Sequence, residues 1–306
     1  MPARRTDAAA IGMMLRSFLF VPADNERKIA RGLQSEADAL ILDLEDSVAP
    51  DRKAEARKLL AGQLADLDGS TVPKLYVRIN PLDSPHVLED LLAATHAAVA
   101  GIVLPKACGR HDIDRCGHYL DMAESAKGIA PGAIGILPVV TETAAAVLRL
   151  PELTAPIGRL HALTWGGEDL ATVLGARGNK RPSGEWDDSF RLARALALLA
   201  AAACDVPAID TLHADFRDGE GLRAAGLAAR HAGFAGKIAI HPDQVSVINE
   251  VFAPSETEIE DARAVVAAFA ASPGSGVVGL GGRMLDRPHL VAAQRLLATT
   301  GEVLQS

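Results

Sequence analysis

The feature that most constrains this chain is a regular alternation of short apolar runs with longer amphipathic segments. Apolar runs separated by helical patterns are typical of a parallel sheet covered by helices on both faces. The expected strands are 17–23, 39–47, 74–81, 101–107, 134–142, 160–169, 206–215 and 237–242. Eight such units predict closure into a (β/α)8 TIM barrel. An open doubly wound sheet is the alternative, but no glycine-rich dinucleotide turn follows the first run.

The segments between and after these runs predict helices. The expected helices are 27–37, 51–64, 84–99, 112–128, 187–205, 221–233, 255–271 and 287–301. The last two are separated by a glycine-rich stretch, 272–283, which we interpret as a flexible linker. The predicted organisation is a disordered leader over 1–14, a barrel over 15–254 and a helical arm over 255–306. The arm is expected to pack as a lid on its own barrel or on a neighbouring one.

Composition excludes several classes of protein. The formal net charge of −8 argues against a nucleic-acid surface. The three cysteines have no metal-ligand spacing and are expected to be free thiols in a reducing cytoplasm. No run approaches the roughly 18 uninterrupted apolar residues of a membrane helix. We therefore expect a cytoplasmic protein with neither a membrane nor a nucleic-acid partner.

Two apolar runs end on carboxylates, Glu142 and Asp169, which are 27 residues apart. This spacing fits neighbouring strands of a parallel sheet joined by one helix. Two adjacent carboxylates repel each other unless a divalent cation or a proton lies between them. The pair is thus a candidate Mg²⁺ site. The alternative, left open by the spacing, is that each acid caps the helix that follows it.

Other polar side chains are expected at the same rim, because barrel enzymes place their catalytic groups at the carboxyl ends of strands. Arg78 could hold a substrate carboxylate bidentately, or it could form a structural salt bridge to an acid of the preceding strand. Lys106 could be a Schiff-base nucleophile, but lysines at such rims more often pair with carboxylates. The further rim candidates are Asp43, Glu45, Asp46, Asn80, Glu168, Asp210, His213, His241 and Asp243.

Several segments together resemble the citrate lyase beta-subunit-like (CitE-like) family within the HpcH/HpaI aldolase group. The matching segments, in chain order, are RSFLFVPA (16–23), ADALILDLEDSVAPDRKAEAR (37–57), YVRIN (76–80), GIVLPKA (101–107), LPVVTET (137–143), LTWGGEDLA (163–171), GKIAIHPDQVSVINEVFAPS (236–255) and GGRMLDRPHLVAAQRL (281–296). The resemblance covers nearly all of the chain from Arg16 onward.

The resemblance implies an enzyme, a Mg²⁺-dependent carbon–carbon lyase that cleaves a 3-hydroxyacyl-CoA of the citryl-, malyl- or citramalyl-CoA type. Its products would be an acyl-CoA such as acetyl-CoA and a small oxo-acid. Mn²⁺ is a possible substitute for Mg²⁺, and coenzyme A is part of the substrate. The resemblance also implies a homo-oligomer, either a trimer or a hexamer.

The family's functional residues map onto this chain position by position. Glu142 and Asp169 match the metal ligands, and Arg78 matches the arginine that holds the oxo-acid. Asp286 matches an acid that transfers the proton of the enolate carbon and that, in relatives, reaches the site of an adjacent subunit. We also count Glu45 and Asp46 as catalytic candidates. The positions where relatives contact CoA correspond to Arg16, Arg27 and Lys28.

Other functions remain open at this point. A thioesterase would use the same metal and arginine but direct water at the thioester. The usual arginine–proline pair after the first strand is replaced by Asp24, Asn25 and Glu26, which leaves room for a citrate lyase subunit acting on a carrier-bound citryl thioester. A class II aldolase acting on free oxo-acids and a non-catalytic scaffold are further alternatives, although a scaffold predicts losses among the mapped residues.

Overall fold

The structure is a computed structural model that describes residues 15–67 and 73–300. The described chain divides into two compact units, Leu15–Phe252 and a C-terminal unit that begins at Ala253. The expected leader, 1–14, lies outside the described residues. The position of the arm on a barrel stays a prediction.

The first unit contains eight parallel strands in the order β5-β4-β3-β2-β1-β8-β7-β6. The strands are β1 Ser17–Pro22, β2 Ala39–Asp43, β3 Lys74–Arg78, β4 Val99–Leu104, β5 Gly135–Pro138, β6 Leu163–Thr164, β7 Ala208–Asp210 and β8 Gly236–Ala239. Parallel bridges between Ile136 and Leu160 and between Val139 and Thr164 join the two end strands. The sheet therefore closes, and the predicted (β/α)8 barrel is confirmed.

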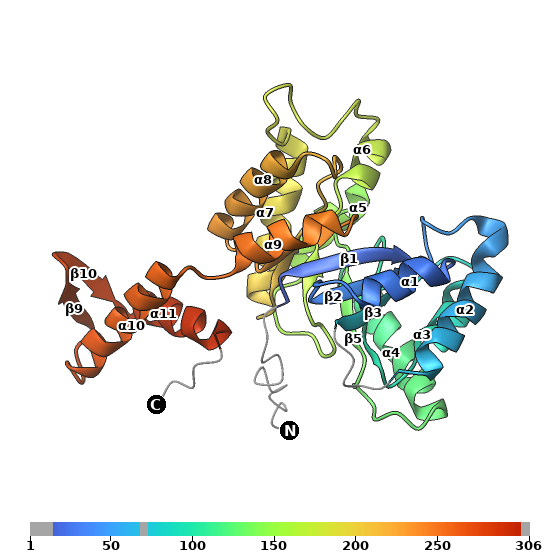
Figure 1. The fold of residues 1–306 in the computed structure, drawn as a ribbon, viewed down its shortest axis with the longest axis horizontal. Helices are drawn as coiled ribbons and strands as arrows, with labels where there is room; N and C mark the ends of the chain where they lie inside the picture. The colour runs from blue at the N-terminus through green and yellow to red at the C-terminus, as the bar shows by residue number, and fades with distance from the viewer. Residues whose placement is uncertain (1–14, 68–72, 301–306) are drawn as a thin grey trace. The chain divides into compact units, whose positions relative to one another are not determined.

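Helices surround the strands (Figure 1). They are α1 Glu26–Leu33, α2 Lys53–Ala65 after the 3-10 turn η2 Pro50–Arg52, α3 Val87–Ala94, α4 Arg110–Ala126, α5 Ala144–Arg149 followed by the 3-10 turn η3 Leu150–Glu152, α6 Glu168–Leu174, α7 Asp188–Ala203, α8 Gly219–Ala232 and α9 Asp243–Phe252. Several begin at a polar cap: the side chains of Asn25, Thr143 and Asp218 accept backbone N–H groups of α1, α5 and α8. A helix was expected after each of the two acids, but without a range; α5 begins just beyond the run 134–142, and α6 begins within the run 160–169.

The strands alternate between two cores, as the period of a strand requires. One core lies inside the barrel and is built from residues such as Phe18, Ile41, Tyr76, Val103, Leu137, Ile209 and Ile238. The other lies between the strands and the helices and contains the residues between these positions, such as Leu19, Leu40, Leu42, Leu75 and Val77. Glycine makes room for the large inner side chains: a Cβ on Gly101 would lie 2.6 Å from the Tyr76 ring. The inner core fills the barrel below its carboxyl rim.

The C-terminal unit contains α10 Glu256–Ala270, a hairpin of β9 Val277–Leu280 and β10 Arg283–Asp286, and α11 Arg287–Thr299. The expectation of a flexible linker over 272–283 is therefore wrong for the part that forms the hairpin. Gly281 and Gly282 form its two-residue turn with φ of 56° and 74°. Positive φ at both positions is the geometry of a type I′ turn, which matches the twist of an antiparallel pair. The two glycines thus form the turn that lets β9 and β10 pair.

A small apolar core of Ala262, Ala293 and Leu297 holds the two helices of this unit together. In the described part of the chain, no helix combines the length and the apolar character that crossing a membrane requires.

Candidate active site

Arg78 and Asp43 form the first half of the site at the carboxyl ends of β3 and β2, where the two residues are register partners. The Arg78 guanidinium donates from Nε to Oδ1 and from Nη2 to Oδ2 of Asp43, both at 2.7 Å. It also lies 4.6 Å above the centroid of the Phe20 ring. The structural salt bridge considered for Arg78 is thus present. This bidentate contact fixes the orientation of the guanidinium.

The charges of this pair are stabilised mutually. Burial disfavours ionisation of Asp43, but the Arg78 hydrogen bonds and charge more than offset it and lower the pKa of Asp43. Burial likewise opposes the charge of Arg78, and Asp43 and Glu45 raise the Arg78 pKa above its ordinary value. Two of the five guanidinium N–H groups are used by Asp43. A substrate can therefore meet only the remaining Nη1 and Nη2 hydrogens.

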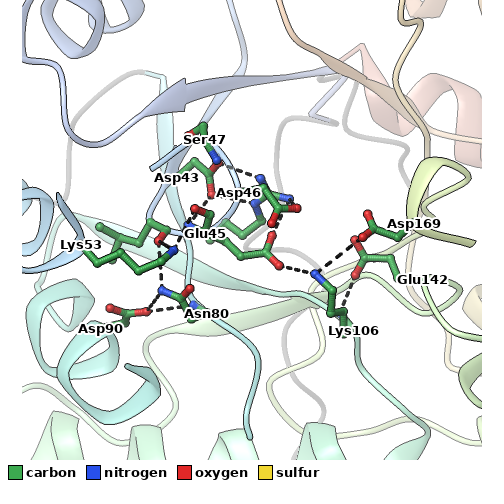
Figure 2. Close-up of polar contacts among 12 residues, drawn as sticks. Asp43, Glu45, Asp46, Ser47, Lys53, Asn80, Asp90, Lys106, Glu142 and Asp169 are labelled. Atoms are coloured by element: carbon green, nitrogen blue, oxygen red, sulfur yellow. Dashed lines mark hydrogen bonds and ion pairs between the residues drawn. The ribbon is translucent and has the colours of Figure 1, made fainter. Parts of the chain in front are cut away.

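Glu45 follows β2 in a loop whose backbone carbonyls accept hydrogen bonds from buried side chains (Figure 2). The buried Lys53 donates from Nζ to the carbonyls of Leu44 and Glu45, each at 3.0 Å. Asn80 donates to the Leu44 carbonyl at 3.0 Å and to Asp90 at 2.6 Å. Burying these polar groups is tolerated because each is paired. These hydrogen bonds give Glu45 a defined position.

The Glu45 carboxylate contacts two cations. Oε2 lies 2.9 Å from Arg78 Nη1, and Oε1 lies 2.5 Å from Lys106 Nζ. Asp46 is more distant, 4.0 Å from Arg78 Nη1, and its side chain is 60% exposed. Burial raises the pKa of Glu45, although both cations oppose the shift. Of these two acids, Glu45 is the buried one.

Glu142 and Asp169 form the second half of the site, and their carboxylates lie side by side facing Lys106 in Figure 2. Neither is the last residue of a strand, because β5 ends at Pro138 and β6 at Thr164. Glu142 is buried in the loop after β5, where Oε2 accepts the backbone N–H of Lys106 at 2.5 Å. Asp169 lies in the first turn of α6. The barrel thus brings the two acids together from a loop and a helix.

The alternative that each acid caps the following helix does not hold for Glu142. Thr143, and not Glu142, caps α5 by accepting the N–H of Ala146. Asp169 carries its charge in the first turn of α6, where the helix dipole favours an anion. Gly166 permits their approach, since a Cβ there would lie 2.9 Å from Cγ of Glu142.

The donor set fits Mg²⁺. Burial raises the pKa of Glu142 to about 8, and the charges of Glu45 and Asp169 add to the effect. A divalent cation beside Glu142 would favour the ionised carboxylate that burial disfavours. No group of three or more histidine, cysteine, aspartate or glutamate residues in the described ranges is arranged as a metal site. Two carboxylates completed by water and substrate oxygens are a typical Mg²⁺ environment.

A cavity of about 80 Å³ lies beside these groups at the mouth of the barrel. Its lining includes Phe20, Arg78, Glu142, Trp165, Gly166 and Asp169. The cavity therefore joins the arginine half of the site to the half with the paired acids, and it is open to a small polar group.

The predicted CoA contacts are not gathered at one place. Arg16 precedes β1 and pairs through Nε with Asp38 Oδ2 at 2.8 Å. The six residues of β1 extend roughly 20 Å, so Arg16 lies at the end of the barrel opposite to the site. Arg27 and Lys28 are exposed in the first turn of α1, directly after the carboxyl end of β1. A CoA contact at these residues stays a prediction, which the geometry favours for Arg27 and Lys28 over Arg16.

Asp286 is the last residue of β10 and the N-cap of α11. Its Oδ1 lies 2.5 Å from Nδ1 of His289, and its side chain is 48% exposed. Asp286 thus directly precedes a helix, as the predicted helix 287–301 implied. Its catalytic role stays a prediction.

Sequence reasoning missed the support of the site. Lys53 and Asp90 lie in helices whose amphipathic patterns place charged residues on solvent, and nothing in the pattern marks these two as buried. The partners of the rim candidate Asp210 were also missed: Lys237 donates to Asp210 Oδ2 at 3.0 Å, while Arg194 Nε and Trp165 Nε1 donate to Oδ1. The lysine in the apolar run KIAIHP was the available signal, because a lysine in a buried strand needs a partner.

Comparisons with known proteins agree with this architecture. The HpcH/HpaI aldolase/citrate lyase family model matches residues 16–242. A (3S)-malyl-CoA thioesterase of Cereibacter sphaeroides (strain KD131 / KCTC 12085) is 36% identical over 287 residues, which cover 92% of this chain and 93% of that protein. An L-malyl-CoA/beta-methylmalyl-CoA lyase of Rhodobacter capsulatus is 33% identical over 299 residues, with 92% and 93% covered.

A solved structure is similar along almost the whole chain. It is the protein CitE from Mycobacterium tuberculosis in complex with magnesium, acetoacetate and coenzyme A. The TM-score is 0.76 with 31% sequence identity, and the match covers 95% of this chain and 100% of that one.

Proposed function

This chain belongs to the HpcH/HpaI aldolase/citrate lyase family, and we propose that it is a Mg²⁺-dependent carbon–carbon lyase acting on a 3-hydroxyacyl-CoA. Membership of a family of lyases confirms the expectation of an enzyme. The proposed substrates are of the citryl-, malyl- or citramalyl-CoA type. The products would be an acyl-CoA such as acetyl-CoA and a small oxo-acid.

One observation carries the proposal: a fixed guanidinium and two carboxylates, the buried Glu142 and the partly exposed Asp169, line the same cavity. Arg78, Glu142 and Asp169 all contribute to its walls. The carboxylates suit a hard divalent cation, and the arginine suits an anionic substrate. Support also comes from the similar CitE structure, which contains magnesium, acetoacetate and coenzyme A.

The chemistry requires charge to be held at two places. Cleavage turns the substrate hydroxyl into a carbonyl, and the electrons of the broken carbon–carbon bond pass to the enolate of the thioester. Mg²⁺ held by Glu142 and Asp169 would supply Lewis acidity at the hydroxyl and carboxylate oxygens. Arg78 would bind the same end through the Nη1 and Nη2 hydrogens that Asp43 does not use. The fixed guanidinium contributes here because it needs no reorientation during the reaction.

Two acids are proposed for proton transfer. Glu45 accepts the hydroxyl proton, because the raised pKa of this buried carboxyl makes it a stronger base than an exposed one. Asp286 delivers a proton to the enolate carbon, and it does so from a neighbouring subunit of the expected trimer or hexamer. CoA would lie along the first turn of α1, near Arg27 and Lys28.

A thioesterase is the second candidate, favoured by the 36% identity to a (3S)-malyl-CoA thioesterase. It would use the same metal and arginine, but water would attack the thioester carbon. A citrate lyase subunit acting on a carrier-bound citryl thioester is a third candidate, in line with the family's description.

Product identification separates these functions. The purified protein would be incubated with citryl-, malyl-, methylmalyl- and citramalyl-CoA, with Mg²⁺ and with excess chelator. The proposal predicts an oxo-acid and an acyl-CoA in equal amounts from at least one ester, and only with metal. A free hydroxy-diacid plus CoA would identify the thioesterase. No turnover of any ester by metal-loaded protein would contradict both functions.

A further inference from the structure

Lys106 lies between the two halves of the site and contacts both (Figure 2). Its ammonium is 2.5 Å from Oε1 of Glu45 and 3.7 Å from Oδ1 of Asp169. Its backbone N–H donates to Oε2 of Glu142. One residue therefore holds the carboxylate beside Arg78 and both carboxylates of the proposed metal site.

The backbone of Lys106 is unusual for a lysine. Its φ is 52°, in the left-handed region that side chains disfavour by roughly 1–2 kcal/mol and that glycine adopts freely. This conformation directs the N–H toward Glu142, and glycine would provide it without the cost. A lysine at this position indicates that the ammonium itself contributes to the site.

The distribution of charge indicates what it contributes. Glu45 lies within 3 Å of two cationic side chains, Arg78 and Lys106. Asp169, in contrast, has an ion pair with Lys106 alone among the described residues. Two neighbouring carboxylates with a single ammonium, 3.7 Å from Asp169, are poorly compensated, and a divalent cation would compensate them better. Lys106 and the metal would therefore compensate the charge of the same carboxylates.

We propose that the Lys106 ammonium is the counter-ion of the Mg²⁺ position in the metal-free protein, and that Mg²⁺ competes with it for Asp169. This inference rests on the proposed function, since it assumes the metal site. Lys106 acts as a positioning residue: without metal it offsets the repulsion between the carboxylates and keeps them aligned, and when the metal binds it pairs with Glu45 alone. The ammonium lowers the affinity for Mg²⁺ while it stabilises the empty site.

A purely structural role for Lys106 predicts the opposite sign. If its only function were to hold Glu45 and align the carboxylates, removing the ammonium would disorder the site and weaken Mg²⁺ binding. The direction of the change in affinity therefore separates the two roles.

The test is Mg²⁺ binding by isothermal titration calorimetry to the wild type, Lys106→Met and Lys106→Arg, each checked for folding by circular dichroism. Methionine keeps the length of the side chain and removes the charge. We expect Lys106→Met to bind Mg²⁺ at least about tenfold more tightly, because a positive charge close to the ion is removed. Lys106→Arg keeps the charge and should remain within about threefold of the wild type. Equal or weaker binding by Lys106→Met would overturn the proposal.

Thermal unfolding supplies a second reading on the same variants. Without metal, Lys106→Met should melt at a lower temperature than the wild type, because repulsion among the carboxylates is no longer offset. With saturating Mg²⁺ its melting temperature should rise by more than that of the wild type. An equal rise for both proteins would overturn the proposal.

The same titrations distinguish the failure of the two ideas. A wild type that binds Mg²⁺, with no tighter binding by Lys106→Met, would refute the role of Lys106 and leave the proposed function standing. A wild type that binds no Mg²⁺ would refute both.

Discussion

At the scale of single residues, Arg78 combines a structural salt bridge with the proposed contact to the substrate. Asp43 binds the Nε and Nη2 edge of the guanidinium, while Nη1, which lies 2.9 Å from Glu45, and the second Nη2 hydrogen face the proposed substrate position. The pairing was one of the two alternatives considered from the sequence, because Asp43 and Arg78 lie in consecutive apolar runs and paired strands bring their ends together. What the sequence does not contain is the side-on geometry, which depends on the register of β2 and β3.

Glu142 carries the first prediction. Glu142→Gln keeps the shape of the side chain but removes its charge, so Mg²⁺ affinity should fall by about a hundredfold or more, as expected when one of two charged ligands is lost. Calorimetry with Mg²⁺ measures the change, and far-UV circular dichroism should show an unchanged fold. Glu168→Gln is the matched control, because Glu168 is a neighbouring acid whose carboxylate accepts from Asn179. An unchanged affinity in Glu142→Gln would remove the metal assignment.

Asp210 carries the second prediction. It is the buried partner of Lys237 and of Arg194, and removing one member of a buried ion pair typically costs about 3–5 kcal/mol. Asp210→Asn should lower the free energy of unfolding by about that amount in urea titrations. The control is Arg223→Gln, whose exposed pair with Glu250 should contribute less than about 1 kcal/mol. A loss of similar size in both variants would contradict the burial argument.

Asp210 also determines how the stability of the protein should change with pH. Burial alone would raise the Asp210 pKa, but Lys237 and Arg194 lower it below the ordinary value of 3.8. A carboxyl with a lowered folded-state pKa stabilises the protein fully above its unfolded value and loses that contribution as the pH falls toward the folded value. The stability difference between wild type and Asp210→Asn should therefore shrink below about pH 4. A difference that grows on acidification would contradict it.

At the scale of elements, the barrel followed from periodicity, but the boundaries did not. The apolar runs 134–142 and 160–169 predicted strands to their acidic ends, whereas the strands are Gly135–Pro138 and Leu163–Thr164. The residues after them form loops, and Glu168 and Asp169 lie in the first turn of α6. Hydrophobic patterning does not mark where these two strands end, because buried apolar residues such as Val139, Val140 and Trp165 continue beyond them. The acids nevertheless meet, since the loops leave from neighbouring strands.

The hairpin of the C-terminal unit provides the third prediction. Gly281 and Gly282 have positive φ, so Gly282→Ala should destabilise this unit by about 1 kcal/mol. Hydrogen exchange of the β9 and β10 amides would measure the loss. Gly279→Ala is the matched control, because Gly279 lies in β9 without a positive φ and a Cβ there meets no atom within 4 Å. Equal effects of the two substitutions would show that the turn geometry is not what the glycines provide.

At the scale of the whole molecule, the sequence predicted the barrel and the family, and both are confirmed. Eight apolar runs with helical spacing leave few architectures that bury every strand. The support of the site was less predictable: Lys53, Asp90 and Lys237 are charged residues whose burial depends on contacts between distant segments. Their roles emerge only once packing places a carbonyl or a carboxylate beside each of them.

The expected oligomer leads to the fourth prediction. If Asp286 acts on the barrel of a neighbouring subunit, Arg78→Ala and Asp286→Ala should each be inactive, yet a mixed assembly should regain activity. Random mixing of equal amounts restores about a quarter of the sites in a cyclic assembly, because each site then needs one intact contribution from two different subunits. The variants would be mixed under conditions that exchange subunits, followed by an assay of oxo-acid release. Inactive mixtures that size-exclusion chromatography shows to be co-assembled would contradict donation between subunits.

The central claim is that this barrel breaks a carbon–carbon bond and protonates the resulting enolate. The most direct test is cleavage of the best thioester substrate in D₂O with Mg²⁺, with the products analysed by mass spectrometry at early times. A lyase predicts an acyl-CoA carrying one deuterium on the carbon next to the thioester, together with an equal amount of oxo-acid. Free CoA and an intact hydroxy-diacid, without any acyl-CoA, would contradict the account.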